Sequence, residues 1–183
     1  MRIITGLLKG RQISLPKGMG IRPTSDRTKE GIFSIINARK VIHETQVLDL
    51  FAGSGNLGFE AISRGAQRVT AVDKNKRCTN FIDKTARELG ITDQIQTRTS
   101  SIEQYLSTPA IPYDIIFADP PYSYPEIPKL ITTVLSNGWL HNNGWLILEH
   151  DKRHDFSEHE HLLLARSYGR TIVSIFTKPN NES

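Results

Sequence analysis

Short apolar runs along this chain alternate with segments whose apolar residues recur every three or four positions. Runs such as "QVLDLF" and "YDIIFAD" are typical of buried strands, whereas segments such as 75–89 have helical spacing. The pattern predicts strands at 46–51, 68–73, 94–99, 113–119 and 144–150, and helices at 57–64, 75–89, 101–106 and 125–136. Such alternation predicts an α/β fold, with a parallel sheet covered by helices on both faces.

The two ends of the chain depart from this rhythm. At the amino terminus, β-like patches at 2–5 and 11–15 predict a small hairpin, followed by a helix at 26–38. At the carboxyl terminus, apolar segments at 161–167 and 169–178 are close enough to pair as an antiparallel hairpin. We therefore expect two parts. Residues 1–40 would form a hairpin and helix extension, and residues 41–183 the main domain.

Charge is distributed unevenly over the chain. Residues 1–40 hold nine Lys or Arg and two acidic residues, a balance of +7, whereas the remainder holds 14 basic and 17 acidic residues, a balance of −3. Clustered Lys and Arg attract polyanions, because neutralising phosphates releases counterions. The basic segment therefore indicates nucleic-acid binding, with an ordinary solvated surface as the alternative.

Several protein classes are disfavoured by composition. At 183 residues the chain suits one core, and its apolar runs are too short for a membrane span or a signal peptide. Cys78 is the single cysteine, which fits a reducing compartment. We expect a soluble, cytoplasmic protein. His154, His159 and His161 match no standard zinc spacing, so no metal is expected.

A glycine-rich turn follows the first strand of the main domain. Gly53, Gly55 and Gly58 form a G-x-G-x-x-G pattern, and Asp73 comes 20 residues after Gly53, at the end of the next strand. This spacing fits the dinucleotide fingerprint, whose acidic residue binds ribose hydroxyls. A hydride-transferring dehydrogenase is therefore one interpretation.

The residues that precede the first glycine favour another cofactor. Asp49 would place a carboxylate at the strand tip, which suits a cationic ligand better than a pyrophosphate. Phe51 and Ala52 make the turn broader than a tight phosphate turn. S-adenosylmethionine meets both conditions, since its sulfonium and ammonium groups suit Asp49 and its ribose diol suits Asp73.

The run "YDIIFADPPY" ends a buried strand in a stiff corner. Pro120 and Pro121 fix the backbone and donate no N–H, so Asp119 and Tyr122 would project from the carboxyl end of the strand. The alternative is a simple strand terminator. Because the carboxyl ends of parallel strands meet at one edge, Asp73, Asp119 and the serines at 100–101 should converge there.

Three motifs in order resemble one enzyme family. "GIRPTSDRTKEGIF", "DLFAGSG" and "DPPY" look like those of the RsmD family of class I S-adenosylmethionine-dependent methyltransferases, over nearly the whole chain. The resemblance implies a Rossmann-like, seven-stranded sheet, mostly parallel, with its last strand inserted antiparallel. It also implies methylation of the exocyclic N2 of one guanine in 16S ribosomal RNA. Asp73 stands where relatives often carry Glu, a change that preserves the ribose-binding chemistry.

The resemblance also assigns roles to residues. The expected cofactor site comprises Asp49, Phe51, Ala52, Gly53, Ser54, Gly55, Asp73, Lys74, Ser100 and Ser101. The expected substrate entrance comprises Arg22, Thr24, Asp26 and Arg27, and the expected catalytic corner comprises Asp119, Pro120, Pro121 and Tyr122. The corner would accept the N–H bonds of the target amine, and its tyrosine would stack on the flipped base.

Two rival functions use some of the same features. A DNA adenine-N6 methyltransferase shares the "DPPY" chemistry, although this chain has little length for a separate recognition region. A noncatalytic RNA-binding protein would use the basic arm but not the carboxylates. The expected partner is 16S ribosomal RNA, either free or in the small-subunit ribosomal particle. The protein itself is expected to be a monomer.

Overall fold

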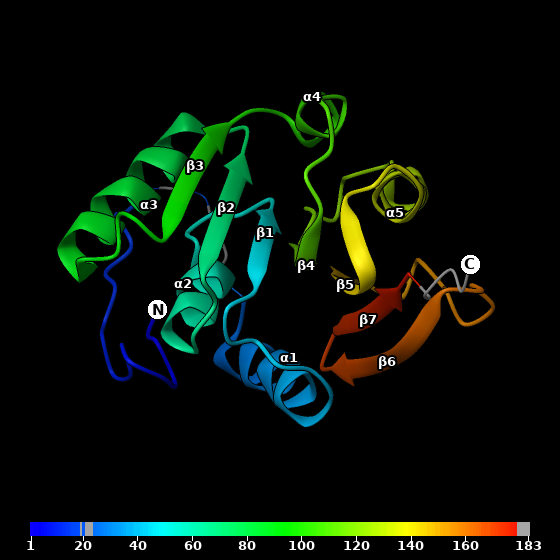
Figure 1. Cartoon of the computed structure of the whole chain (residues 1–183), viewed down its shortest axis with the longest axis horizontal. Helices are drawn as coiled ribbons and strands as arrows, with labels where there is room; N and C mark the ends of the chain where they lie inside the picture. Colours follow the sequence, from blue (N-terminus) through cyan, green and yellow to red (C-terminus); the bar gives the residue numbers. More distant parts are fainter. Residues whose placement is uncertain (19, 21–23, 179–183) are drawn as a thin grey trace.

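Seven strands form a single sheet at the centre of the protein (Figure 1). The computed structural model describes residues 1–18, 20 and 24–178. The sheet order is β3-β2-β1-β4-β5-β7-β6. The strands are β1 (Gln46–Leu50), β2 (Arg68–Asp73), β3 (Ile95–Thr99), β4 (Tyr113–Ala118), β5 (Leu140–His150), β6 (Leu162–Tyr168) and β7 (Thr171–Thr177). The helices are α1 (Asp26–Arg39), α2 (Asn56–Ser63), α3 (Lys76–Leu89), α4 (Ile102–Leu106) and α5 (Ile127–Ser136).

The topology confirms the expected Rossmann-like arrangement. Strands β1 to β5 are mutually parallel, with Leu48 paired to Ile116 across β1 and β4. β7 lies antiparallel between β5 and β6, with Phe176 paired to Leu146. The change of rhythm after residue 150 therefore marks the antiparallel end of the sheet.

Helices cover both faces of the sheet, as the alternating pattern predicted. α1, α2 and α3 form one apolar core with the strand side chains on one face of the sheet. In this core the ring centroids of Phe33 and Phe117 lie 5.7 Å apart. α4 and α5 pack on the opposite face, where Trp139 and Val134 are fully buried. In the described part of the chain, no helix has the length and apolarity needed to cross a bilayer.

The predicted amino-terminal hairpin forms as a short antiparallel pairing around one bridge. Arg2 pairs with Gln12, and no strand forms on either side of this bridge in the described residues. Ile3 and Ile13 are nevertheless buried in the same core as α1. Contacts with the main core and cross-strand backbone hydrogen bonds, such as that from the Ile3 N–H to the Arg11 carbonyl at 3.0 Å, together hold this segment. β5 starts at Leu140, earlier than the predicted 144, and its pairing with β4 shifts register between Tyr113 and Ile115.

A buried ion pair fastens the amino-terminal segment to α2. The Lys29 ammonium donates to the Arg2 carbonyl at 2.6 Å and to Asn56 Oδ1 at 2.7 Å, and it lies 3.6 Å from the Glu60 carboxylate. Glu60 also accepts the backbone N–H groups of Ile4 and Thr5. Burial lowers the pKa of Lys29, and the Glu60 charge opposes that shift. The Glu60 carboxylate thereby supplies hydrogen-bond acceptors for the backbone N–H groups of Ile4 and Thr5, which would be costly to bury without partners.

Candidate active site

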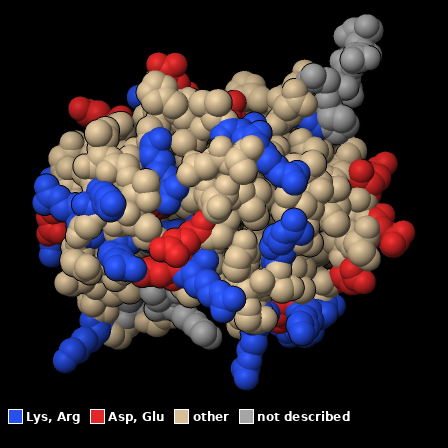
Figure 2. Space-filling view, turned by 90° about the horizontal axis from the view of Figure 1, so that it is seen from below, with Lys and Arg blue, Asp and Glu red and all other residues tan. Residues whose placement is uncertain are grey.

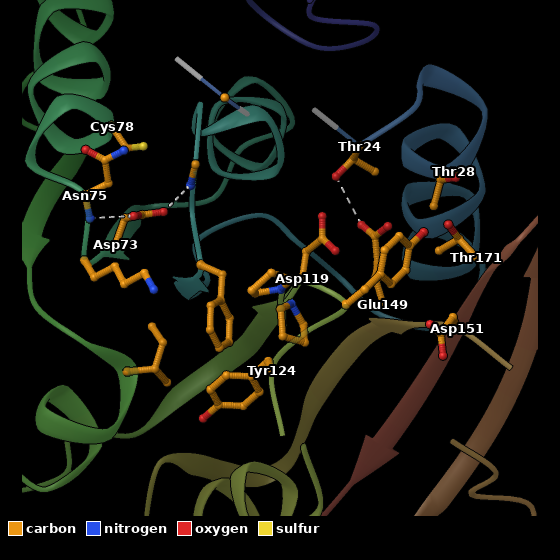
Figure 3. A pocket seen from close by; sticks show the side chains of 18 of the residues that line it. Thr24, Thr28, Asp73, Asn75, Cys78, Asp119, Tyr124, Glu149, Asp151 and Thr171 are labelled. Carbon is orange, nitrogen blue, oxygen red and sulfur yellow. Dashed lines mark hydrogen bonds between the residues drawn. The ribbon is translucent and has the colours of Figure 1, made fainter. Parts of the chain in front are cut away.

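A large pocket opens at the carboxyl edge of the parallel strands. Its volume is about 1270 Å³. Residues at the carboxyl ends of β1, β2 and β4 line it, among them Phe51, Asp73 and Asp119. Glu149, near the end of β5, lines it as well. The structure thus brings Asp73, Ser101 and Asp119, which were expected at one sheet edge, into one cavity. Figure 3 shows Asp73 and Asp119 on either side of the turn that follows β1.

The turn after β1 has an unusual backbone. Phe51, Gly53 and Gly55 have φ angles of 58°, 54° and 74°, in the left-handed region. A bulky residue such as Phe51 rarely adopts that conformation. The backbone N–H of Ala52 donates to the carbonyl of Val72 at 3.0 Å, which holds the turn against β2. The broad turn inferred from the sequence is therefore a rigid loop that faces the pocket.

Asp73 holds this loop in place from the neighbouring strand. Its Oδ2 accepts the Gly53 N–H at 2.8 Å, and its Oδ1 accepts the Asn75 N–H at 2.8 Å (Figure 3). Each carboxylate oxygen can accept more than one hydrogen bond. Because Asp73 also lines the pocket, it can both fix the loop and accept from a ligand.

Asp49 lies beneath the pocket and is not part of its wall. Its side chain is buried and accepts the Gly58 N–H at 3.2 Å. Burial raises the pKa of Asp49 well above its ordinary value, and the nearby Asp119 and Asp73 charges raise it further. Its place on the strand directs the side chain under the first turn of α2. The expected role of Asp49 in binding the cofactor stays a prediction.

The stiff corner after β4 projects as the sequence predicted. Asp119, Pro120, Pro121 and Tyr122 all line the pocket, and Tyr122 is 56% exposed. Arg153 Nη2 donates to the Tyr122 carbonyl at 2.8 Å, and the guanidinium carbon lies 5.9 Å from the centre of the tyrosine ring. The tyrosine ring therefore stands at the pocket mouth with a cation beside it.

Glu149 is a pocket residue that the sequence analysis missed. It is 5% exposed, and its Oε1 accepts the Thr24 hydroxyl at 3.2 Å. Burial raises the pKa of Glu149 well above its ordinary range, and the Asp119 charge adds to the shift. Burial also raises the pKa of Asp119 to about 6, while the Thr24 hydroxyl opposes that shift. The available signal was an acidic residue near the end of the predicted strand at 144–150, but the sequence does not show which strand lies beside it.

Aromatic side chains form a second wall. Phe51 and Tyr124 meet edge to face with ring centroids 5.0 Å apart, and Ile102 also lines the cavity. A hydrogen bond from its own backbone N–H lowers the pKa of the Glu103 carboxyl, and a hydrogen bond from the Tyr124 hydroxyl lowers it further. The sequence did not single out Tyr124, because its role depends on the loop between β4 and α5.

The other expected site residues divide into two groups. Gly53, Lys74, Ser101 and Thr24 line the pocket together with the residues above. Seven expected residues do not line it or cannot be placed: Ala52, Ser54, Gly55, Ser100, Asp26 and Arg27 are absent from its wall, and Arg22 lies outside the described residues. Asp26 instead pairs with Arg2 at 2.9 Å on the surface.

Basic side chains are spread over the face shown in Figure 2. Lys and Arg lie over the left and middle of this view, whereas its right edge carries Asp and Glu, and the basic side chains do not gather into one compact stripe. Lys9, Arg11 and Lys17 of the amino-terminal segment are exposed. These side chains are therefore accessible to a ligand at the surface.

Comparison with known proteins identifies relatives along the full fold. The family model described as "Conserved hypothetical protein 95" matches residues 1–177. Ribosomal RNA small subunit methyltransferase D of Haemophilus influenzae is 34% identical over 177 residues, covering 95% of this chain and 91% of that protein. The namesake protein of Escherichia coli K12 is 33% identical over 149 residues, covering 81% of this chain and 74% of its own length.

Solved structures agree with this relationship. The Escherichia coli protein yhhF superimposes with a TM-score of 0.87 at 28% identity, and the match covers 98% of each chain. An RNA methyltransferase from Salinibacter ruber, solved with S-adenosyl-L-homocysteine, has a TM-score of 0.69 at 14% identity. It covers 88% of this chain and 97% of its own, and it supports the fold alone.

Proposed function

This chain belongs to the "Conserved hypothetical protein 95" family, with the small-subunit methyltransferase D proteins, and we propose that it methylates the exocyclic N2 of one guanine in 16S ribosomal RNA. The methyl donor is S-adenosylmethionine. One observation carries the proposal. The pocket combines a carboxylate suited to ribose, Asp73, with a carboxylate corner suited to an amine, Asp119 to Tyr122.

The two carboxylates set the direction in which the cofactor lies. If the ribose diol donates to Asp73, the adenine extends toward the aromatic wall of Phe51 and Ile102, and the sulfonium extends toward Asp119. Ser101 and Lys74 then lie on the ribose and adenine side. A flat apolar slot suits a purine ring, whereas buried carboxylates suit the cationic end.

The corner residues prepare a weak nucleophile. The N2 lone pair of guanine is delocalised into the ring, so the site must hold the amine with its lone pair toward the methyl group. Asp119 and the Pro120 carbonyl are the proposed acceptors of its two N–H bonds. The prolines restrict the backbone there, which limits the reorganisation needed when the amine binds.

The transfer itself needs no further reactant. The nitrogen lone pair forms the new N–C bond as the C–S bond breaks, and its electrons remain on sulfur. The sulfonium thereby becomes the neutral thioether of S-adenosylhomocysteine. The positive charge passes to the amine, which then releases a proton to Asp119 or to water. Tyr122, exposed at the mouth, is placed to stack on the base that has left its helix.

The target is tested by mapping methylated nucleotides. Small-subunit ribosomal RNA from cells with and without the gene would be digested and analysed by mass spectrometry. The proposal expects one N2-methylguanine that is lost with the gene and restored by the wild-type protein, but not by Asp119→Ala. Restoration of an adenine N6-methyl group in DNA would instead favour the DNA methyltransferase. No change in either nucleic acid would favour a noncatalytic binder.

A further inference from the structure

We infer that Glu149 determines base identity in this site, by accepting the N1–H of the guanine whose N2 amine is held at Asp119. The inference rests on the proposed function and adds a residue to it. Glu149 comes from β5, outside the three sequence motifs, and the proposed reaction has so far made no use of it.

The sheet register places the two carboxylates side by side. Ala118 of β4 pairs with Leu148 of β5, so Asp119 and Glu149 are the next residues along the same two strands. Neighbouring strands are about 4.8 Å apart, and adjacent residues in register point to the same face. Helix α1 packs on this face, and the hydroxyl of Thr24, just before the helix, donates a hydrogen bond to Glu149 (Figure 3).

The Glu149 carboxylate is directed into the pocket and incompletely paired. Thr24 donates to Oε1, and within the described residues no other hydrogen bond reaches this carboxylate. A buried carboxylate beside another carboxylate is costly unless a ligand supplies donors. If Thr24 needed only an acceptor, a neutral side chain would serve it without that cost. The arrangement therefore indicates a ligand with two adjacent N–H donors.

Guanine has this donor pattern on its Watson–Crick edge. Its N1–H and N2–H groups are neighbours and point the same way, so one carboxylate can take each. Adenine has N1 as a hydrogen-bond acceptor beside its N6 amine. Its N1 and the Glu149 carboxylate would both be acceptors, so they would repel each other. Burial raises the pKa of both carboxyls, and the Asp119 charge raises that of Glu149 further. Two bound N–H donors would favour the ionised forms of both.

A base analogue can distinguish recognition of the guanine N1–H by Glu149 from a general structural role of this residue. 2-Aminopurine keeps the exocyclic 2-amine but has a bare acceptor at N1. RNA carrying either guanine or 2-aminopurine at the mapped position would be compared in single-turnover methyl transfer, using wild type, Glu149→Gln and the control Glu158→Gln in an exposed loop. The RNA would be used in whichever form, naked or assembled, supports methylation of guanine.

The expected result is a change in the ratio of the two rates. Wild type and Glu158→Gln should prefer guanine by about 100-fold or more, since a site built for a hydrogen bond rejects an analogue that lacks it. In Glu149→Gln that preference should fall by at least about 10-fold, because the amide can donate to a bare N1.

Two other outcomes have distinct meanings. If Glu149→Gln leaves the preference for guanine unchanged, whether or not both rates fall together, Glu149 only supports the fold and the inference is overturned. If the wild-type protein transfers no methyl group to guanine N2 in ribosomal RNA, the proposed function itself fails and the inference falls with it. The ratio is unaffected by partial misfolding, because inactive protein lowers both rates equally.

Discussion

The backbone N–H of Gly53 and the side chain of Asp73 are joined by a 2.8 Å hydrogen bond between two adjacent strand ends. The bond links the glycine loop to the carboxylate expected to bind ribose. It means that one residue both shapes the loop and faces the ligand. Loss of Asp73 should therefore affect the cofactor in two ways, through a missing acceptor and through a looser loop.

Asp73→Ala should weaken S-adenosylmethionine binding by about 10-fold or more, as expected for losing hydrogen bonds to a charged group. The global fold should remain, because Asp73 lies at the pocket and the core is elsewhere. Isothermal calorimetry would give the affinity, and circular dichroism the fold. Asp93→Ala, at an exposed position after α3, serves as the control and should bind normally. Unchanged affinity in Asp73→Ala would remove Asp73 from the ribose site.

Asp119→Asn should slow methyl transfer by about 100-fold or more, in line with loss of one preorganised hydrogen bond to the reacting group. The same change should make the folded protein more stable at pH 8, by about 1–3 kcal/mol, because it removes a carboxylate whose pKa burial has raised to about 6. Single-turnover transfer and denaturant unfolding would measure the two effects. A variant with both normal rate and normal stability would show that the corner only terminates β4.

The pH dependence of wild-type stability follows from the same shift. The folded state holds the Asp119 proton up to about pH 6, whereas an unfolded carboxyl releases it near 3.8. Between these values the folded state binds more protons, so the free energy of unfolding should fall as pH rises from about 4 to about 6. Asp119→Asn should flatten this part of the curve. An identical curve for both proteins would contradict the assignment.

Cofactor affinity should depend on pH through the charge of the ligand. S-adenosylmethionine carries a sulfonium, whereas S-adenosylhomocysteine has a neutral sulfur. If the sulfonium faces Asp119, S-adenosylmethionine affinity should rise relative to that of S-adenosylhomocysteine as pH increases from about 5 to about 7, through the Asp119 pKa of about 6. Calorimetry with both ligands would test this. A constant affinity ratio would place the sulfonium away from the carboxylate pair.

Arg153→Gln should lower the rate of methyl transfer to RNA while cofactor affinity stays normal. Arg153 holds the Tyr122 carbonyl and lies beside its ring, and Asp151 in turn pairs with Arg153 at 2.6 Å. We expect about a 10-fold loss, the effect of one charged hydrogen bond. Lys152→Gln removes the same charge at the adjacent exposed position and should keep the normal rate. Equal losses in both variants would indicate a general charge effect.

The basic amino-terminal segment should bind phosphates of the RNA. Replacing Lys9, Arg11 and Lys17 by Gln should weaken RNA binding and reduce its salt slope by about 0.7–0.9 for each phosphate that is no longer neutralised. S-adenosylmethionine affinity should be unaffected, because none of the three lines the pocket. RNA binding would be measured across a salt series.

The control for this triple variant removes the same charge elsewhere. Arg68, Lys84 and Lys129 lie on β2, α3 and α5 and are also exposed. Their replacement by Gln should leave the salt slope nearly unchanged. If both triple variants reduce the slope alike, RNA binding is distributed over the surface, as the spread of basic side chains in Figure 2 would allow.

The sequence alone determined the alternating elements and the shared position of Asp73 and Asp119. Apolar periodicity is a local property, and parallel strands always bring their carboxyl ends to one edge. The glycine loop and the double proline are likewise local signals, because each residue type restricts its own backbone. These features could therefore be read without knowing which strands are neighbours.

Only the tertiary structure decided which side chains face one another. Asp49 stands at a strand tip in the sequence, but its side chain turns under α2 to the Gly58 N–H. Glu149 looks like an ordinary strand residue until the β4–β5 register sets it beside Asp119. Lys29 looks like a surface helix residue until α2 brings Glu60 to it. Each of these pairings depends on how the elements pack in space, and local sequence patterns carry no information about that packing.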